Sequence, residues 1–214
     1  MKYNLVIFDM DGTILDTLND LKNSLNYCLK KYNFNERSLE EVRSFVGNGI
    51  RRLIELSIPN INSSIIDEIY KIFIDYYDKH CNDTTKVYEG IIDTIKELKK
   101  QNVLTAVVSN KADLVVQKLC SIYFEGLFDY QIGMQNGIRK KPFPDSVIKV
   151  MESLNVDKEH TIYVGDSEVD VETSKNANIK CISVDWGFRK RDYLEKLNNY
   201  KVISNPKEIL EIIK

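Results

Sequence analysis

Short apolar segments alternate along this chain with longer segments of helical periodicity, and the alternation restricts the fold more than any other feature. The apolar segments are rich in β-branched residues and several end on an acid, as buried strands do. Four are clear and two are weaker: they span residues 3–9, 104–109, 161–166 and 181–184, and then 128–133 and 201–203. Strand-helix-strand alternation requires right-handed crossovers, so it predicts a parallel sheet covered on both faces.

One interval breaks the alternation. The first strand ends at Asp9 and the second begins near Leu104, which is far too long a gap for one crossover helix. Almost all of residues 17–86 has helical periodicity, so we predict a helical bundle inserted into the core. The expected fold is therefore α/β, with a Rossmann-like parallel sheet core from residues 1–16 and 87–214, and a helical domain from residues 17–86.

Composition limits the function classes. The chain has 30 Lys and Arg against 32 Asp and Glu, a formal charge of −2, which argues against a protein that grips nucleic-acid backbone. No apolar run approaches the roughly 18 residues that a membrane helix needs. Since Asp9 also interrupts any signal-like stretch, we expect a soluble, cytoplasmic protein with neither nucleic acid nor membrane as partner. A monomer and a homodimer are both compatible with the sequence.

The cysteines and histidines do not form a metal motif. No Cys-x-x-Cys pair exists, and neither histidine has a histidine neighbour at ligand spacing. We therefore expect reduced thiols at Cys28, Cys81, Cys120 and Cys181, and structural or surface roles for His80 and His160.

Polar residues follow the predicted strands where each strand ends. In an open parallel sheet these carboxyl ends meet at one edge, where ligands bind. Carboxylates converging there would repel one another without a cation, and oxygen donors without His or Cys suit Mg²⁺. A lysine and a hydroxyl beside them suit a phosphate group. The segments are Asp9-Met10-Asp11-Gly12-Thr13, Ser109-Asn110-Lys111, Lys140-Lys141-Pro142 and the run from Gly165 and Asp166 to Asp170.

The four segments, in this order, resemble the four motifs of the haloacid dehalogenase-like (HAD) hydrolase superfamily. The resemblance covers essentially the whole chain, and the helical insert matches the cap domain that follows the first motif in that superfamily. Within it, residues 45–53 and 185–189 resemble segments of the phosphoglycolate phosphatases, although these two matches are less specific. The resemblance implies the HAD fold and a phosphoric monoester hydrolase acting on a small phosphorylated metabolite.

The resemblance also implies a role for each motif residue. Asp9 is expected to be the nucleophile that forms an aspartyl-phosphate, and Asp11 the general acid and base. Mg²⁺ is expected on the Asp9 side chain, the Asp11 backbone carbonyl and Asp166. Three roles are open for Asp170. It could bind the metal through water, orient Lys141, or simply be an acid near the positive end of a helix dipole. The residues expected to bind the phosphoryl group or the substrate are Ser109 and Lys141, with Thr13 and Asn110 either joining them or serving a structural role.

Specificity is harder to place. Arg52 is a candidate for holding a substrate carboxylate, and the alternative is an ordinary solvated arginine. The first candidate substrate is 2-phosphoglycolate, because of the phosphoglycolate phosphatase-like segments. Two alternatives remain open: hydrolysis of pyrophosphate by the same core, and a sugar-phosphate mutase of the β-phosphoglucomutase type.

Overall fold

Residues 2–197 and 200–214 are described by the computed structural model, and contacts divide the chain into two units. The α/β unit is formed by Met1–Leu15 with Val87–Lys214, and the helical unit is Asp16–Lys86. The chain passes between them through β2 (Leu15–Asp16) and β3 (Lys86–Val87), which pair as a two-stranded sheet.

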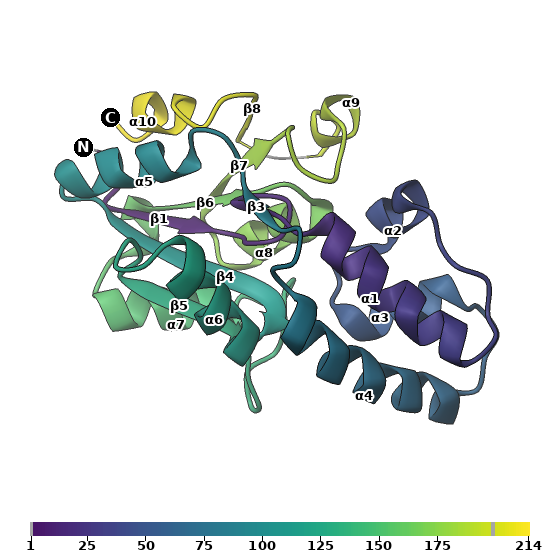
Figure 1. Cartoon of the computed structure of the whole chain (residues 1–214). Coiled ribbons are helices and arrows are strands. Elements are labelled where there is room, and N and C mark those ends of the chain that lie inside the picture. The colour runs from purple at the N-terminus through teal and green to yellow at the C-terminus, as the bar shows by residue number, and fades with distance from the viewer. Residues whose placement is uncertain (1, 198–199) are drawn as a thin grey trace. The chain divides into compact units, whose positions relative to one another are not determined.

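A six-stranded sheet forms the centre of the α/β unit, in the order β5-β4-β1-β6-β7-β8 (Figure 1). Every pairing in it is parallel, as the alternation predicted. Both weaker strand candidates are confirmed as β5 and β8. The strands are β1 (Leu5–Phe8), β4 (Leu104–Ala112), β5 (Tyr130–Met134), β6 (Thr161–Gly165), β7 (Lys180–Val184) and β8 (Lys201–Ile203).

Helices flank the sheet and bury its apolar side chains. One face carries Leu5, Ile7 and Tyr163, which join a buried cluster with residues of α7 and α8. Successive strand residues point to opposite faces, so Phe8 lies on the other side, edge-on to Phe128. The helices of this unit are α5 (Ile91–Lys100), α6 (Asp113–Tyr123), α7 (Asp145–Leu154), α8 (Glu168–Asn176), α9 (Arg191–Leu194) and α10 (Glu208–Ile212), with a 3₁₀ turn at Lys158–His160.

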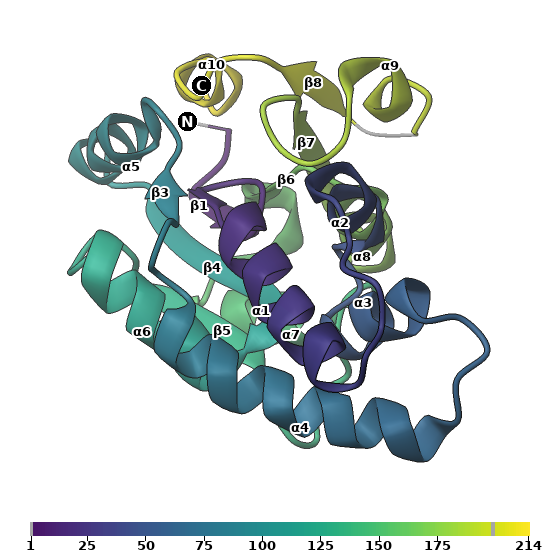
Figure 2. The same cartoon turned by 45° about the vertical axis from the view of Figure 1, so that its right-hand side comes forward.

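The strand order reverses direction at β1, which lies between β4 and β6 (Figure 2). Phe8 is in register with Val107 of β4 and with Val164 of β6. The residues that follow these three strands therefore emerge at the same edge, within a residue or two of one another. This is the switch point at which open α/β sheets bind their ligands.

Four helices make up the helical unit: α1 (Leu18–Lys31), α2 (Leu39–Phe45), α3 (Ile50–Ser57) and α4 (Ser63–His80). The buried Asp20 carboxylate of α1 accepts hydrogen bonds from the backbone N–H groups of Thr84 and Thr85, at 3.0 and 2.9 Å, and from both hydroxyls. These bonds tie α1 to the segment that returns to the α/β unit. None of the helices within residues 2–197 and 200–214 is long and apolar enough to cross a membrane.

Candidate active site

Three carboxylates are buried together at the switch point of the sheet. Asp9 follows β1, Asp166 follows β6, and Asp170 lies in the first turn of α8; their exposed fractions are 8%, 1% and 0%. One carboxylate oxygen from each lies within 4.8 Å of the other two. The parallel pairing of β1 and β6 thus brings Asp9 and Asp166 together, although they lie more than 150 residues apart in the sequence.

Lys141 lies among these acids and is itself buried. Its ammonium is 2.9 Å from Asp9 Oδ1 and 2.7 Å from Asp170 Oδ1. It also donates a 3.0 Å hydrogen bond to the Tyr163 hydroxyl, which in turn donates to the carbonyl of Val108 at 3.1 Å. A lysine has three N–H donors. The protein provides three acceptors for them, so the position of the ammonium is fixed by its surroundings.

Burial and like charge raise the pKa values of two of the carboxylates, Asp9 and Asp166. Burial, followed by the charge of Asp170, raises the pKa of Asp9 to about 7, although Lys141 acts in the opposite direction. Burial, followed by the charges of Asp170 and Asp9, raises the pKa of Asp166 well above its usual value. For Lys141, burial lowers the pKa, but the charges of Asp170 and Asp9 outweigh it and the pKa is raised. The positive charge of Lys141 therefore does not cancel the effect of burial and like charge on the pKa of Asp9.

Asp170 performs two of the tasks that the sequence left open. Its Oδ1 accepts from Lys141, and its Oδ2 accepts from Ser167 N–H at 3.1 Å and from the Ser167 hydroxyl at 2.6 Å. The second set forms a capping box that begins α8. Gly165 is required beside it, because a β-carbon there would overlap the Asp170 side chain. The buried Asp170 carboxylate therefore both caps α8 and orients Lys141.

Asp166 is held by two segments. Thr13, whose side chain is fully buried, donates to Asp166 Oδ1 at 3.3 Å. The backbone N–H of Phe188 donates to Oδ2 at 2.7 Å. This gives the Thr13 hydroxyl an acceptor inside the protein. Gly12 has a φ of +83°, and a β-carbon on it or on Gly187 would overlap Asp166.

The end of β4 brings three consecutive polar residues into the interior. Ser109, Asn110 and Lys111 are 5%, 7% and 4% exposed. The pairing of β4 with β5 is irregular between Val108 and Ala112, a distortion common beside active sites. The Ser109 hydroxyl oxygen accepts from Lys111 N–H at 3.3 Å, and the Asn110 amide donates to the Lys141 carbonyl at 3.0 Å. Asn110 therefore positions the backbone that carries Lys141.

The remaining predicted residues have ion-pair partners. Asp11 Oδ1 lies 3.1 Å from the ammonium of the buried Lys111. Arg52 belongs to the helical unit, where its half-exposed guanidinium pairs with Glu55 on the same helix at 3.2 Å. All four cysteines are buried free thiols, as expected.

The donor set fits a hard divalent cation. The candidate ligands are carboxylate oxygens, and the cluster found among the described residues contains neither His nor Cys. Raised pKa values at Asp9 and Asp166 indicate missing positive charge, which such a cation would supply. Oxygen ligands at a site that also takes phosphate are typical of Mg²⁺.

Several contacts at this site were not predicted. Tyr163 lies in an apolar run and has no polar pattern to distinguish it. The sequence pattern ends the second strand at Ser109, whereas β4 continues to Ala112, so the pattern does not predict the burial of Lys111. Only the resemblance to phosphoglycolate phosphatases distinguishes the loop after β7 in the sequence. Its Trp186 indole N–H donates to the Thr13 carbonyl at 3.0 Å, and its Arg189 pairs with Glu168.

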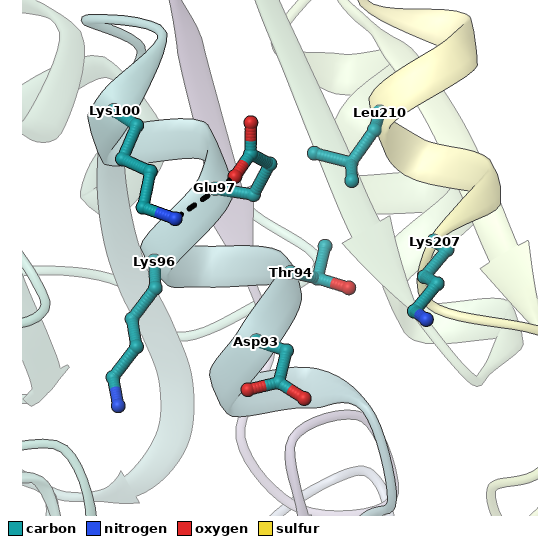
Figure 3. A pocket seen from close by; sticks show the side chains of 7 residues that line it. All are labelled: Asp93, Thr94, Lys96, Glu97, Lys100, Lys207 and Leu210. Carbon is teal, nitrogen blue, oxygen red and sulfur yellow. Dashed lines mark hydrogen bonds and ion pairs between the residues drawn. The ribbon is translucent and has the colours of Figure 1, made fainter.

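A pocket of about 290 Å³ lies elsewhere, between α5 and α10 (Figure 3). Its charges are mixed, and Lys100 is paired with Glu97 at 3.3 Å. The lining residues include none of the predicted site residues: they are Asp93, Thr94, Lys96, Glu97, Lys100, Lys207 and Leu210.

Comparison with known proteins identifies relatives along the whole chain. The phosphoglycolate phosphatase of Aquifex aeolicus is 32% identical over 87% of this chain and 86% of its own. The pyrophosphatase PpaX of Bacillus mycoides is 29% identical over 100% of this chain and 98% of its own. The crystal structure of a provisionally assigned phosphoglycolate phosphatase from Lactobacillus delbrueckii subsp. bulgaricus superposes with a TM-score of 0.92 and 33% identity, over 100% and 99% of the two chains.

A model of one protein family matches residues 6–184. The matched residues contain both the buried acid cluster and its lysine. The chain therefore belongs to the haloacid dehalogenase-like hydrolases, an enzyme family.

Proposed function

We propose that this protein is a Mg²⁺-dependent phosphatase that hydrolyses a small phosphate monoester through an aspartyl-phosphate. The observation that carries the proposal is the buried arrangement of Asp9, Lys141 and Asp170, with Asp166 beside them. A carboxylate nucleophile needs no activating base once it is ionised. Its environment must instead orient it and accept the charge of the incoming phosphate.

Asp9 is the proposed nucleophile. Lys141 and the Met10 N–H both hold its Oδ1, at 2.9 and 2.7 Å. Oδ2 is then the oxygen that attacks phosphorus, and the bond from phosphorus to the leaving oxygen breaks. Mg²⁺, held by Asp9, the Asp11 carbonyl and Asp166, would add positive charge at the phosphoryl oxygens.

Asp11 is the proposed general acid and base. In the first step its carboxyl proton passes to the leaving oxygen, which departs as an alcohol. In the second step it removes a proton from water, which attacks phosphorus and releases inorganic phosphate and the free Asp9 carboxylate. The Ser109 hydroxyl accepts from Lys111 N–H and keeps its own proton for a phosphoryl oxygen.

The first candidate substrate is 2-phosphoglycolate, and pyrophosphate is the second. Relatives named as phosphoglycolate phosphatase and as pyrophosphatase match at similar identity, 32% and 29%. Both compounds are small and offer little apolar surface, so charge must provide the recognition. A mutase with the same core would return the phosphoryl group to its substrate without net release of phosphate.

The test is phosphate release from 2-phosphoglycolate, pyrophosphate, β-glucose 1-phosphate and p-nitrophenyl phosphate, each with Mg²⁺ and with excess EDTA. We expect release that requires Mg²⁺ and is lost in Asp9→Asn. Full activity in EDTA would exclude the metal, and turnover of Asp9→Asn within tenfold of the wild type would exclude Asp9 as the nucleophile. Interconversion of glucose phosphates without phosphate release would indicate a mutase.

A further inference from the structure

Lys111 is a buried cation for which the proposed chemistry gives no role. Its side chain is 2% exposed, at the end of β4 in the interior of the α/β unit. An ammonium is costly to bury, so a lysine in this position is retained only where its charge is compensated. Its place beside the reacting groups indicates a function in the site.

The partner of Lys111 is the residue that would act on the leaving group. Its ammonium lies 3.1 Å from Asp11 Oδ1. A general acid must approach the leaving oxygen within about 2.6–3.2 Å. The Lys111 ammonium is then within roughly 6 Å of that oxygen, since one carboxylate separates them. Atoms one or two bonds beyond the leaving oxygen are within its reach.

We propose that Lys111 selects substrates whose leaving group carries its own negative charge next to the bridging oxygen. This inference rests on the proposed phosphatase function and narrows its substrate class. The charge would be a carboxylate on the adjacent carbon or a second phosphoryl group. A buried ammonium interacts strongly with such a group, because little water screens the pair. An ester with a neutral leaving group gains nothing from the contact.

Arg52 is the competing cation, and its surroundings differ. Its side chain is 52% exposed and pairs with Glu55 on the same helix. Exposed pairs of this kind are weak and screened by solvent. Lys111 extends from a strand of the sheet, and its ammonium is held beside Asp11, the residue that would act on the leaving group. Replacing Lys111 and replacing Arg52 should therefore have different effects on substrate preference.

The experiment compares two esters that differ only in this charge. In 2-hydroxyethyl phosphate, a CH₂OH group replaces the carboxylate of 2-phosphoglycolate. The measured quantity is the ratio of kcat/KM for the charged ester to kcat/KM for the neutral one. We expect Lys111→Met to lower this ratio roughly 100-fold, as the loss of a buried charge-assisted contact does. Lys111→Arg should preserve the preference, and Arg52→Met should keep the wild-type ratio.

The control is Lys99→Met, which removes a lysine of the same unit that pairs with Asp129 at 3.4 Å at the end of α5. It should leave both rates near the wild-type values. Equal loss on both esters in Lys111→Met would overturn the proposal, because Lys111 would then act only through Asp11. Collapse of the ratio in Arg52→Met, or no preference in the wild type, would also overturn it. Absence of phosphate release from both esters would instead reject the proposed function.

A measurement on the wild type covers the case in which Lys111→Met does not fold. Crystals soaked with vanadate and glycolate place a phosphoryl mimic and the leaving group in the site together. We expect the glycolate carboxylate within about 3 Å of the Lys111 ammonium. A carboxylate bound elsewhere, with Lys111 directed only at Asp11, would overturn the proposal.

Discussion

The Tyr163 hydroxyl accepts a hydrogen bond from the Lys141 ammonium at 3.0 Å, inside the α/β unit. It donates its own proton to the Val108 carbonyl at 3.1 Å, which fixes its lone pairs towards the lysine. Since Asp9 and Asp170 accept the other two N–H groups, Tyr163 completes the set of acceptors. A strand residue of the sheet thus orients the cation that orients the nucleophile.

Tyr163→Phe removes this oxygen and nothing else. The variant leaves the Val108 carbonyl without its donor and one Lys141 N–H without its acceptor. We expect the free energy of unfolding to fall by about 1–2 kcal/mol, the usual cost of leaving a buried partner unsatisfied. We also expect kcat to fall about tenfold with KM little changed, because orientation of Asp9 matters most in the transition state.

The control for this prediction is Tyr193→Phe, since Tyr193 is 44% exposed on α9. Urea unfolding and steady-state kinetics of both variants make the comparison. An unchanged kcat in Tyr163→Phe, together with reduced stability, would limit the hydroxyl to a structural role.

Asp9 makes the metal-free protein unusually sensitive to pH. Its pKa in the folded state is about 7, above the ordinary value of 3.8, so the folded protein holds this proton more tightly than the unfolded chain does. The contribution of Asp9 to the free energy of unfolding therefore falls as pH rises from about 4 to 7. In EDTA we expect Asp9→Asn to be more stable than the wild type by on the order of 4 kcal/mol at pH 8. The gain should vanish near pH 4.

Asp145→Asn is the matched control, because its dependence on pH has the opposite sign. Hydrogen bonds from Arg139 lower the pKa of Asp145, so its ionised form stabilises the folded state. That variant should lose stability at neutral pH and approach the wild type in acid. Urea unfolding from pH 2 to 8 tests both, because the contribution of Asp145 is lost only below its ordinary pKa of 3.8. A stability difference for Asp9→Asn that does not change with pH would contradict the argument.

Mg²⁺ should stabilise the folded protein through the acid cluster. A ligand present at 100 times its dissociation constant adds about 2.7 kcal/mol to the free energy of unfolding. We expect Mg²⁺ to raise the Tm of the wild type and to have almost no effect on Asp166→Asn, which loses a charged ligand. Calorimetry with Mg²⁺ alone measures binding without reference to turnover. An equal rise of Tm in both proteins would place the metal elsewhere.

The fold and the acid cluster were predictable because their signals are local. Each buried strand is a short apolar run, and Asp9 and Asp166 stand directly after two of them. Parallel pairing then brings the strand ends together whatever the distance along the chain. Asp170 was placed near the cluster by its position four residues beyond Asp166.

Other contacts at the site leave no trace in the sequence. Tyr163 is one residue of a buried strand, and its hydroxyl is polar only in relation to Lys141. The Phe188 contact with Asp166 uses a backbone N–H, which every residue except proline has. Lys111 is buried because β4 continues to Ala112, and strand ends are poorly defined by pattern alone. These contacts depend on tertiary packing, and the type of a single residue does not predict them.

Gly187 lies in the loop after β7, where that loop passes close to Asp166. A β-carbon on Gly187 would overlap both the Gly12 carbonyl oxygen and the Asp166 side chain. The carbonyl belongs to the backbone and cannot rotate away, so we expect Gly187→Ala to displace Asp166. The cost should be about 2 kcal/mol of folding free energy from overpacking. Mg²⁺ affinity should fall about 10–100-fold, as it does when the support of a ligand is disturbed.

Gly137→Ala separates this effect from the general cost of replacing a glycine. Gly137 has a φ of +82°, and a β-carbon there would meet nothing within 4 Å. The control variant should lose some stability through backbone strain and keep its affinity for Mg²⁺. Calorimetric titration with Mg²⁺ and urea unfolding of both variants give the two quantities. If Gly187→Ala bound Mg²⁺ as tightly as Gly137→Ala, the loop after β7 would have no part in holding Asp166 for the metal.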